Sequence, residues 1–362
     1  MKSLVSIFLL LGSLVCLTLG TENLCQISAS NVNSRSHGVF LNQDGDDYFI
    51  KSPSSGLFQW DKNQAVVIGC PNGIRSTNCE SSSTRISTTC SPSLGPAAKV
   101  TSKSCGKSEE GRVIQLGYPY GSKDKVSISY TLCFNVKKCS VLYSRHSLAG
   151  ANFLPKNLSY VAPTTRNGGV CSTTIDYFYA NSWQERNRNA LGLTRGHLYQ
   201  RAPMVPAIDH PVYSWKTFTN VYVNGAPGWD SVVQGNWAKV TEQVNALARR
   251  TKQSYVVYSG VVYPNQDRFL DRNTNTIKIP QWFWKAVSGS RNGVVFFVLN
   301  NILASREEKA KKFCPQDLCE VLGWRFDKDE SKGLVRCCNF EGEVTKIVPE
   351  DARFSNLLQQ NE

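Results

Sequence analysis

Beyond its first twenty residues the sequence lacks any apolar run that could cross a membrane, because no later stretch approaches the ~20 apolar residues that a helical span requires. It also has no internal repeat and no low-complexity tract, which excludes repeat arrays. Histidine is scarce, with four residues in 362, so few side chains qualify as a general base near neutral pH. Acidic residues are outnumbered, since 28 Asp and Glu stand against 41 Lys and Arg. The net charge of +13 favours polyanionic partners such as nucleic acid, heparin-like glycans or anionic membrane, although many secreted proteins are simply basic.

The N-terminus predicts export from the cell. Lys2 precedes an apolar stretch at residues 4–19, and small side chains near Gly20 suit cleavage, so residues 1–20 are expected to be a secretory signal peptide. One glycosylation acceptor, Asn157-Leu158-Ser159, would mark an exposed loop if it is used. We therefore expect a soluble, extracellular mature protein.

Cysteine usage agrees with export. Removal of Cys16 with the signal leaves twelve cysteines, and an even number in a secreted chain predicts six disulfides whose pairing the sequence does not reveal. The alternative is a zinc site, with ligands at Cys314, Cys319, Cys337 and Cys338. These residues lack zinc-finger spacing and have no histidine nearby, so disulfides are the preferred interpretation.

Composition divides the mature chain into a cysteine-rich β module at 21–126, a larger domain at 127–345 and a C-terminal tail at 346–362. Short β-branched and aromatic runs bounded by Gly, Pro, Asn or Ser predict strands in the module at 46–52, 56–60, 64–70 and 111–118. Longer apolar runs predict strands in the larger domain at 125–136, 139–148, 254–263 and 292–301.

Two helices are predicted in the larger domain. At 236–252 the residues Trp237, Val240, Val244 and Leu247 recur at steps of three and four, which indicates an amphipathic helix with basic residues at its end. The second helix, at 305–314, is highly charged.

The stretch "TRGHLYQRAP" draws attention because it combines Arg195, Gly196 and His197 with a further arginine, Arg201. A lone histidine is more often structural than catalytic. Here a preceding strand-like segment, a glycine that permits a turn and an adjacent arginine favour a catalytic role for His197. Two further segments, "FTNVYVNGAPGW" and "VVQGNWAKVTEQ", follow in order along the chain.

This ordered trio resembles the DNA/RNA non-specific endonucleases, the ββα-metal family related to the secreted nuclease of Serratia, over residues 128–345. In that family Asp-Arg-Gly-His precedes an Asn-x-x-Pro-Gln segment and then a metal-binding helix. The resemblance implies an α+β fold with an antiparallel sheet and flanking helices, Mg²⁺ as cofactor, and DNA and RNA as sequence-independent partners. The signal peptide and preceding cysteine-rich module are similar to the layout of insect secreted salivary nucleases, which makes saliva the expected location.

The resemblance assigns roles to individual residues. His197 falls on the general base that deprotonates the attacking water, and Arg195 on the arginine that clamps the phosphate. Asn224 and Pro227 match the middle segment. Trp237 matches a tryptophan of the metal-binding helix, where it serves packing.

Four positions depart from the family pattern: Thr194 replaces Asp, Gly228 replaces Gln, Val233 stands at the metal-ligating Asn, and Thr241 at a Glu. Valine has no lone pair for a hard cation such as Mg²⁺. The metal site is therefore expected to be degenerate and Mg²⁺ binding weak or absent. Candidates for a substitute ligand are Asn220, Asn224, Asn236 and Glu242.

Binding should suffer less than cleavage, because Lys and Arg contacts to phosphates supply most of the affinity for nucleic acid. The candidates, each with surface charge as the alternative interpretation, are Arg195, Arg201, Arg249, Arg250, Lys252, Lys309, Lys311 and Lys312. The preferred hypothesis is a secreted nucleic-acid-binding protein with weak or residual hydrolysis. The alternatives are an active Mg²⁺-dependent endonuclease with a re-sited ligand and a glycan- or membrane-binding protein. Related nucleases form dimers, but no self-complementary face is visible in this sequence.

Overall fold

The computed structural model describes residues 24–28, 39–44, 47–50, 57–70, 73–80, 90, 97–106, 110–120, 122–138, 140–149, 193–197, 224–264, 269, 278–300, 313–314 and 316–359. Several predicted features lie outside these ranges: the signal peptide, the glycosylation acceptor at Asn157, and most of the charged helix predicted at 305–314. The same holds for the candidate site residues Arg201, Asn220, Lys309, Lys311 and Lys312. Within the described residues, no helix has the length and apolar character needed to cross a bilayer.

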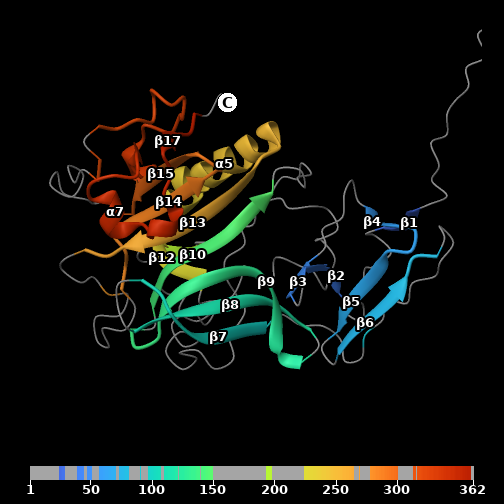
Figure 1. The fold of residues 1–362 in the computed structure, drawn as a ribbon. Helices are drawn as coiled ribbons and strands as arrows, with labels where there is room; N and C mark the ends of the chain where they lie inside the picture. The colour runs from blue at the N-terminus through green and yellow to red at the C-terminus, as the bar shows by residue number, and fades with distance from the viewer. Residues whose placement is uncertain are drawn as a thin grey trace, which may run out of the picture.

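The N-terminal strands form a small β module, as the sequence predicts. β1 (Leu24–Ser28) pairs with β4 (Leu57–Asp61), and a second sheet has the order β3-β2-β5-β6. Its strands are β2 (Val39–Asp44), β3 (Asp47–Ile50), β5 (Ala65–Cys70) and β6 (Gly73–Asn78). The ring of Phe40 packs 4.7 Å from Phe58 and 4.9 Å from Trp60, measured between ring centroids. Figure 1 shows these strands gathered at one end of the molecule.

A nine-stranded sheet forms the centre of the molecule, in the order β16-β15-β14-β13-β10-β9-β8-β7, with β17 beside β15. All its pairings are antiparallel except that of β15 with β17. The strands are β7 (Ala97–Ser104), β8 (Gly111–Tyr120), β9 (Ser122–Asn135), β10 (Ser140–Ala149), β13 (Ser254–Val262), β14 (Trp282–Ser288), β15 (Asn292–Leu299), β16 (Val335–Cys338) and β17 (Asn356–Leu357). Residue 126 therefore lies inside β9, and β7 and β8 continue the same sheet as β13–β16.

Both faces of the central strands are covered. On one face Phe283, Val287 and Phe296 pack with the buried residues of α5 (Ala238–Thr251) in a single apolar cluster. On the other face Trp284 and Phe297 pack with residues of α7 (Val344–Ile347), of η8 (Glu350–Ala352) and of the segment around them. Burial on both sides explains why β14 and β15 are almost continuously apolar rather than alternating.

A short helical turn precedes the helix that the sequence predicts. This turn comprises α4 (Asp230–Val232) and the start of η6 (Val233–Trp237), and the non-helical backbone of Gly235 makes a kink between it and α5. The predicted apolar stripe is confirmed, because Trp237, Val240, Val244 and Leu247 are all buried. The helix ends at Lys252, whose φ of 58° is left-handed, after a last turn that carries two arginines.

Among the described residues, five disulfides join ten cysteines and confirm the disulfide interpretation. They link Cys25–Cys79, Cys70–Cys90, Cys105–Cys133, Cys314–Cys338 and Cys319–Cys337. The zinc alternative at Cys314, Cys319, Cys337 and Cys338 is wrong, because a sulfur in a disulfide is not a thiolate and cannot serve as a zinc ligand. Cys139 and Cys171 lie outside the described residues.

Candidate functional site

A two-stranded hairpin carries the first two motif segments. β11 (Leu193–His197) pairs antiparallel with β12 (Gly225–Trp229). In this register His197 lies opposite Gly225, Arg195 opposite Pro227, and Thr194 opposite Gly228. The structure thus brings the Arg-Gly-His segment beside the Asn-x-x-Pro segment, although 27 positions separate His197 from Asn224 in the sequence. The hairpin runs directly into α4, which completes a strand–strand–helix unit.

Asn300 fastens this hairpin to the central sheet. It is buried just after β15, and its amide nitrogen donates to the carbonyls of Pro227 at 3.0 Å and Pro280 at 2.8 Å. Its side-chain oxygen accepts from the backbone N–H of Trp229 at 3.0 Å. This residue was not predicted from the sequence, where the available signal was a polar amide directly after a buried apolar strand.

Val233, which the motif spacing predicts to stand at the family's metal-ligand position, lies against the hairpin. Its side chain is fully buried, and a Cβ built on Gly228 would lie only 2.5 Å from Val233 Cγ2. The same Cβ would lie 3.0 Å from the ring of Phe283, so the valine methyl and this ring enclose Gly228. Gly228 is itself the register partner of Thr194. Two of the sequence departures, Gly228 and Val233, are therefore in direct contact.

The side chains at these positions do not fit a hard cation. Val233 offers only carbon atoms, whereas Mg²⁺ requires oxygen ligands. Thr241, which the motif spacing predicts to stand at the family's glutamate position, is buried, and its hydroxyl donates to the carbonyl of Trp237 at 3.3 Å within the helix. Among the candidate substitutes, Glu242 is exposed on α5 and Asn224 is buried directly before β12.

Asn236, the third candidate substitute, holds a loop at residues 325–333 against the helix. Its amide nitrogen donates to the carbonyls of Asp327 at 2.9 Å and Gly333 at 2.6 Å. Its side-chain oxygen accepts from the backbone N–H of Asp327 at 2.9 Å. Both ends of the carboxamide are thus engaged by the loop.

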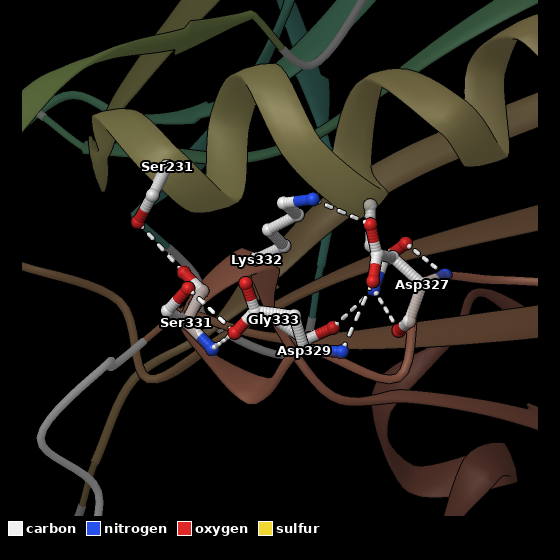
Figure 2. Close-up of polar contacts among 7 residues, drawn as sticks. Ser231, Asp327, Asp329, Ser331, Lys332 and Gly333 are labelled. Carbon is white, nitrogen blue, oxygen red and sulfur yellow. Dashed lines mark hydrogen bonds and ion pairs between the residues drawn. The ribbon is translucent and has the colours of Figure 1, made fainter.

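Further contacts hold this loop along the start of the helix, as Figure 2 shows. Ser231 donates its hydroxyl to the carbonyl of Ser331 at 2.7 Å. Gly235 makes close approach possible, because a Cβ there would lie 2.8 Å from Lys332 Cβ. The backbone of Gly235 is non-helical, with φ of −86° and ψ of −120°, at the point where the loop packs into η6. The shape of this turn therefore depends on a loop about ninety residues away in sequence.

The loop also contains its own ion pair. Lys332 Nζ lies 2.6 Å from Asp327 Oδ2 (Figure 2). The hydrogen bond from Lys332 lowers the pKa of the Asp327 carboxyl, and the same bond raises the pKa of Lys332. A hydrogen bond from the Ser331 hydroxyl lowers the pKa of Asp329. These carboxylates are therefore charged at neutral pH.

A buried polar cluster lies beneath the helix, and it was not predicted from the sequence. Lys285 on β14 is 2% exposed, and its ammonium donates to the Ser259 hydroxyl at 2.6 Å. His146 on β10 is 6% exposed. Its burial, followed by the positive charges of Lys285 and Arg145, holds the pKa of its imidazole well below the usual value. The signal in the sequence was a single lysine inside the apolar run "IPQWFWKAV".

The predicted nucleic-acid contacts on α5 lie at the other end of the helix from the hairpin. Arg250 and Lys252 are exposed and Arg249 is half-buried. At ~1.5 Å per residue, Arg250 is about 25 Å along the helix from Val233. The structure does not bring these three side chains to the motif, so they would form a second, more distant part of an interface.

Comparison with known proteins agrees with this geometry. A family model described as DNA/RNA non-specific endonuclease matches residues 109–329. A salivary endonuclease of Culex quinquefasciatus is 28% identical over 339 residues, covering 89% of this chain and 88% of that protein. A salivary endonuclease of Lutzomyia longipalpis is 27% identical over 372 residues, covering 93% and 87%.

A third relative, the salivary protein Tsal1 of Glossina morsitans morsitans, is 24% identical over 279 residues, covering 69% of this chain and 67% of that protein. The α+β fold with its ββα unit, expected from the motif order, is confirmed, as is the relation to insect salivary proteins. Because the matched residues span more than half of the sequence, the chain belongs to the DNA/RNA non-specific endonuclease family.

Proposed function

We propose that the protein is a secreted, sequence-independent nucleic-acid-binding protein whose phosphodiester hydrolysis is weak or residual. The family acts on DNA and RNA, which gives the class of partner. The observation that supports the proposal is the packing of buried, apolar Val233 against Gly228, because the motif spacing predicts that Val233 stands where the family has a metal ligand.

The magnitude of the loss follows from the part that a metal ion plays in this chemistry. A bound divalent cation stabilises transition-state charge by several kcal/mol. Losing ~4 kcal/mol of that stabilisation slows cleavage by ~10³-fold. His197 and Arg195 remain as general base and phosphate clamp, so a slow residual reaction is expected rather than none.

Binding is supported by charge instead of by the metal. The chain has a net charge of +13, and basic side chains at the end of α5 are exposed. If ~6–10 phosphates are contacted, affinity should fall by ~10³–10⁵ between ~50 and ~200 mM salt. A flat salt response would contradict the proposal. Strong competition by heparin but none by DNA would favour a glycan-binding protein.

The second candidate function is a fully active Mg²⁺-dependent endonuclease with a re-sited ligand. Two relatives that match most of this chain are named salivary endonucleases, which favours it. Asn236 serves the loop at 325–333 through both ends of its carboxamide, which counts against that residue as the new ligand. Glu242 is exposed and Asn224 is buried beside the hairpin, and both stay candidates.

The deciding experiment is to titrate the mature protein into labelled duplex DNA with Mg²⁺ and with EDTA, reading both mobility shift and strand length. Under the proposal, DNA is bound in both buffers and stays full length over a time in which an active nuclease degrades it. Rapid Mg²⁺-dependent shortening by the wild type would establish the second candidate instead.

Two variants and one control variant identify the residues responsible. Val233→Asn should raise Mg²⁺-dependent cleavage, because it supplies an oxygen ligand for the metal ion beside the hairpin. Val321→Asn, at a valine that is 72% exposed, introduces the same change away from the site and should leave cleavage unaltered. His197→Ala should abolish any hydrolysis and leave binding largely intact.

Export is proposed on similar grounds. Five disulfides are typical of an oxidising compartment, and the named relatives are salivary. Saliva is accordingly the proposed location.

A further inference from the structure

The buried lysine beneath the helix has no role in the proposed function described so far. Lys285 lies in the middle of β14, a strand whose residues are all buried. Its neighbours along the same face of the strand, Phe283 and Val287, belong to the apolar cluster under α5. A Met or Leu at this position would pack in the same space without the cost of burying an amine.

That cost is reflected in the pKa of the amine. Burial lowers the pKa of Lys285 to about 7 from 10.5. Among the described residues, the elements packed around it supply His146 from β10, Ser259 from β13, and Trp237 with apolar neighbours from the helix. His146 has its own pKa held well below 6.5, so it stays neutral while the lysine is charged.

The contact that the charge makes is specific. Lys285 Nζ lies 4.7 Å from the centroid of the Trp237 ring, within the range of a cation–π interaction. On its other side the ammonium donates to Ser259 at 2.6 Å. The indole is in turn stacked on Phe283 with ring centroids 5.1 Å apart. The ammonium and the phenyl ring together define where the indole lies.

Trp237 connects this contact to the candidate site. It is the last residue of η6, the kinked turn that begins at Val233. Val233 packs against the hairpin at Gly228. The ring of Phe283 stacks on Trp237 and also lies beside Gly228. The kink at Gly235 therefore lies between two residues that are both held by packing.

We propose that Lys285 is a positioning residue for the nucleic-acid site, whose buried ammonium holds Trp237 and thereby sets the turn Val233–Trp237 against the β11–β12 hairpin. The inference rests on the proposed function for what the site binds. The positioning itself is a property of the fold and has a readout that needs no nucleic acid.

The test compares three variants of the mature protein. Lys285→Met keeps the volume and removes the charge, and Ser259→Ala removes the acceptor while leaving the lysine in place. Val244→Ala is the matched control, because it opens a cavity under the same helix without touching the ammonium. Measurements are melting temperature at pH 6, amide hydrogen exchange at residues 230–241, and affinity for duplex DNA at low salt.

We expect Lys285→Met to melt no lower than the wild type, yet to exchange faster at 230–241 and to bind DNA about tenfold more weakly. Ser259→Ala should also raise the exchange rate at residues 230–241 and weaken DNA binding, in each case by less than Lys285→Met does. Val244→Ala should lower the melting temperature and leave DNA affinity within about twofold, since its change is cavity formation away from η6.

The reverse pattern would overturn the inference. Suppose that Lys285→Met lowers the melting temperature as Val244→Ala does and leaves amide hydrogen exchange at residues 230–241 unchanged. The lysine is then only a structural element of the core. If Lys285→Met cannot be recovered folded, unchanged exchange in Ser259→Ala leads to the same conclusion. If the wild type does not bind DNA at all, the proposed function fails, while hydrogen exchange still decides the role of Lys285.

Discussion

The contact between Gly228 and Val233 predicts a measurable coupling between two positions that depart from the family pattern. Gly228→Ala adds a methyl group that would lie 2.5 Å from Val233 Cγ2 and 3.0 Å from the ring of Phe283. Carbon atoms prefer separations of ~3.5–4.0 Å, so the overlap is about 1 Å. Overpacking of this kind costs ~1–3 kcal/mol, and the lower entropy of unfolded alanine returns ~0.4–1 kcal/mol. We expect a net loss of about 1–2 kcal/mol in the free energy of unfolding.

Val233→Ala removes the methyl groups responsible for this overlap. Alone it should cost about 2 kcal/mol, because two buried carbons are lost and a cavity remains. In the double variant the methyl group introduced by Gly228→Ala enters the space that the valine side chain has vacated. The combined loss should therefore be smaller than the sum of the single losses by ~1–2 kcal/mol, within the range measured for residues in contact.

Urea denaturation of the disulfide-intact protein, followed by tryptophan fluorescence, measures all four members of the cycle. Gly73→Ala is the control, because nothing lies within 4 Å of a Cβ at that glycine. Its free energy of unfolding should stay within ~0.5 kcal/mol of the wild type. Additivity of the two single variants to within ~0.3 kcal/mol would refute the claim that Val233 fills the space beside Gly228.

Two further predictions concern residues around the same helix. Asn236→Ala should lower the free energy of unfolding by ~3 kcal/mol, because it leaves the backbone groups of Asp327 and Gly333 without hydrogen-bond partners. In the same urea titration the control Gln234→Ala, at an exposed residue, should change this free energy by less than ~0.5 kcal/mol. For Lys285, the folded pKa of about 7 lies below 10.5, so the unfolded chain binds more protons between these values and stability rises with pH there. The difference in unfolding free energy between wild type and Lys285→Met should therefore grow in favour of the wild type by at most ~1.4 kcal/mol per pH unit across this window. A pH-independent difference would mean that the lysine is charged in both states.

The helix shows how far local pattern reaches. The spacing of Trp237, Val240, Val244 and Leu247 was sufficient to predict it, because amphipathic periodicity is a property of neighbouring residues. The short turn that precedes it from Asp230 and the kink at Gly235 were not predictable. Gly235 and Asn236 take their conformations from the loop at 325–333, which is distant in sequence.

Strand pairing shows what the local sequence pattern does not predict. The strand at β8 was predicted from its own residues, but its place in the nine-stranded sheet was not, because pairing joins segments that are distant along the chain. The segment that forms β14 was not predicted as a strand at all. Its one charge, on Lys285, interrupts an apolar run, and only the packing of Trp237 and Ser259 around the amine makes burial tolerable.

The order and spacing of three motifs were enough to indicate the family, and counting along them predicts a valine at the position of the metal ligand. Both are local information, because the identity of a residue at a counted position needs no knowledge of the fold. Three other features came only from packing: Val233 is buried against Gly228, Asn236 is engaged by a loop, and a buried ammonium lies under Trp237. The last two are contacts between distant segments, and the first depends on how β12 packs against the turn that follows it. All three exist only once the sheet, the hairpin and the helix are packed together.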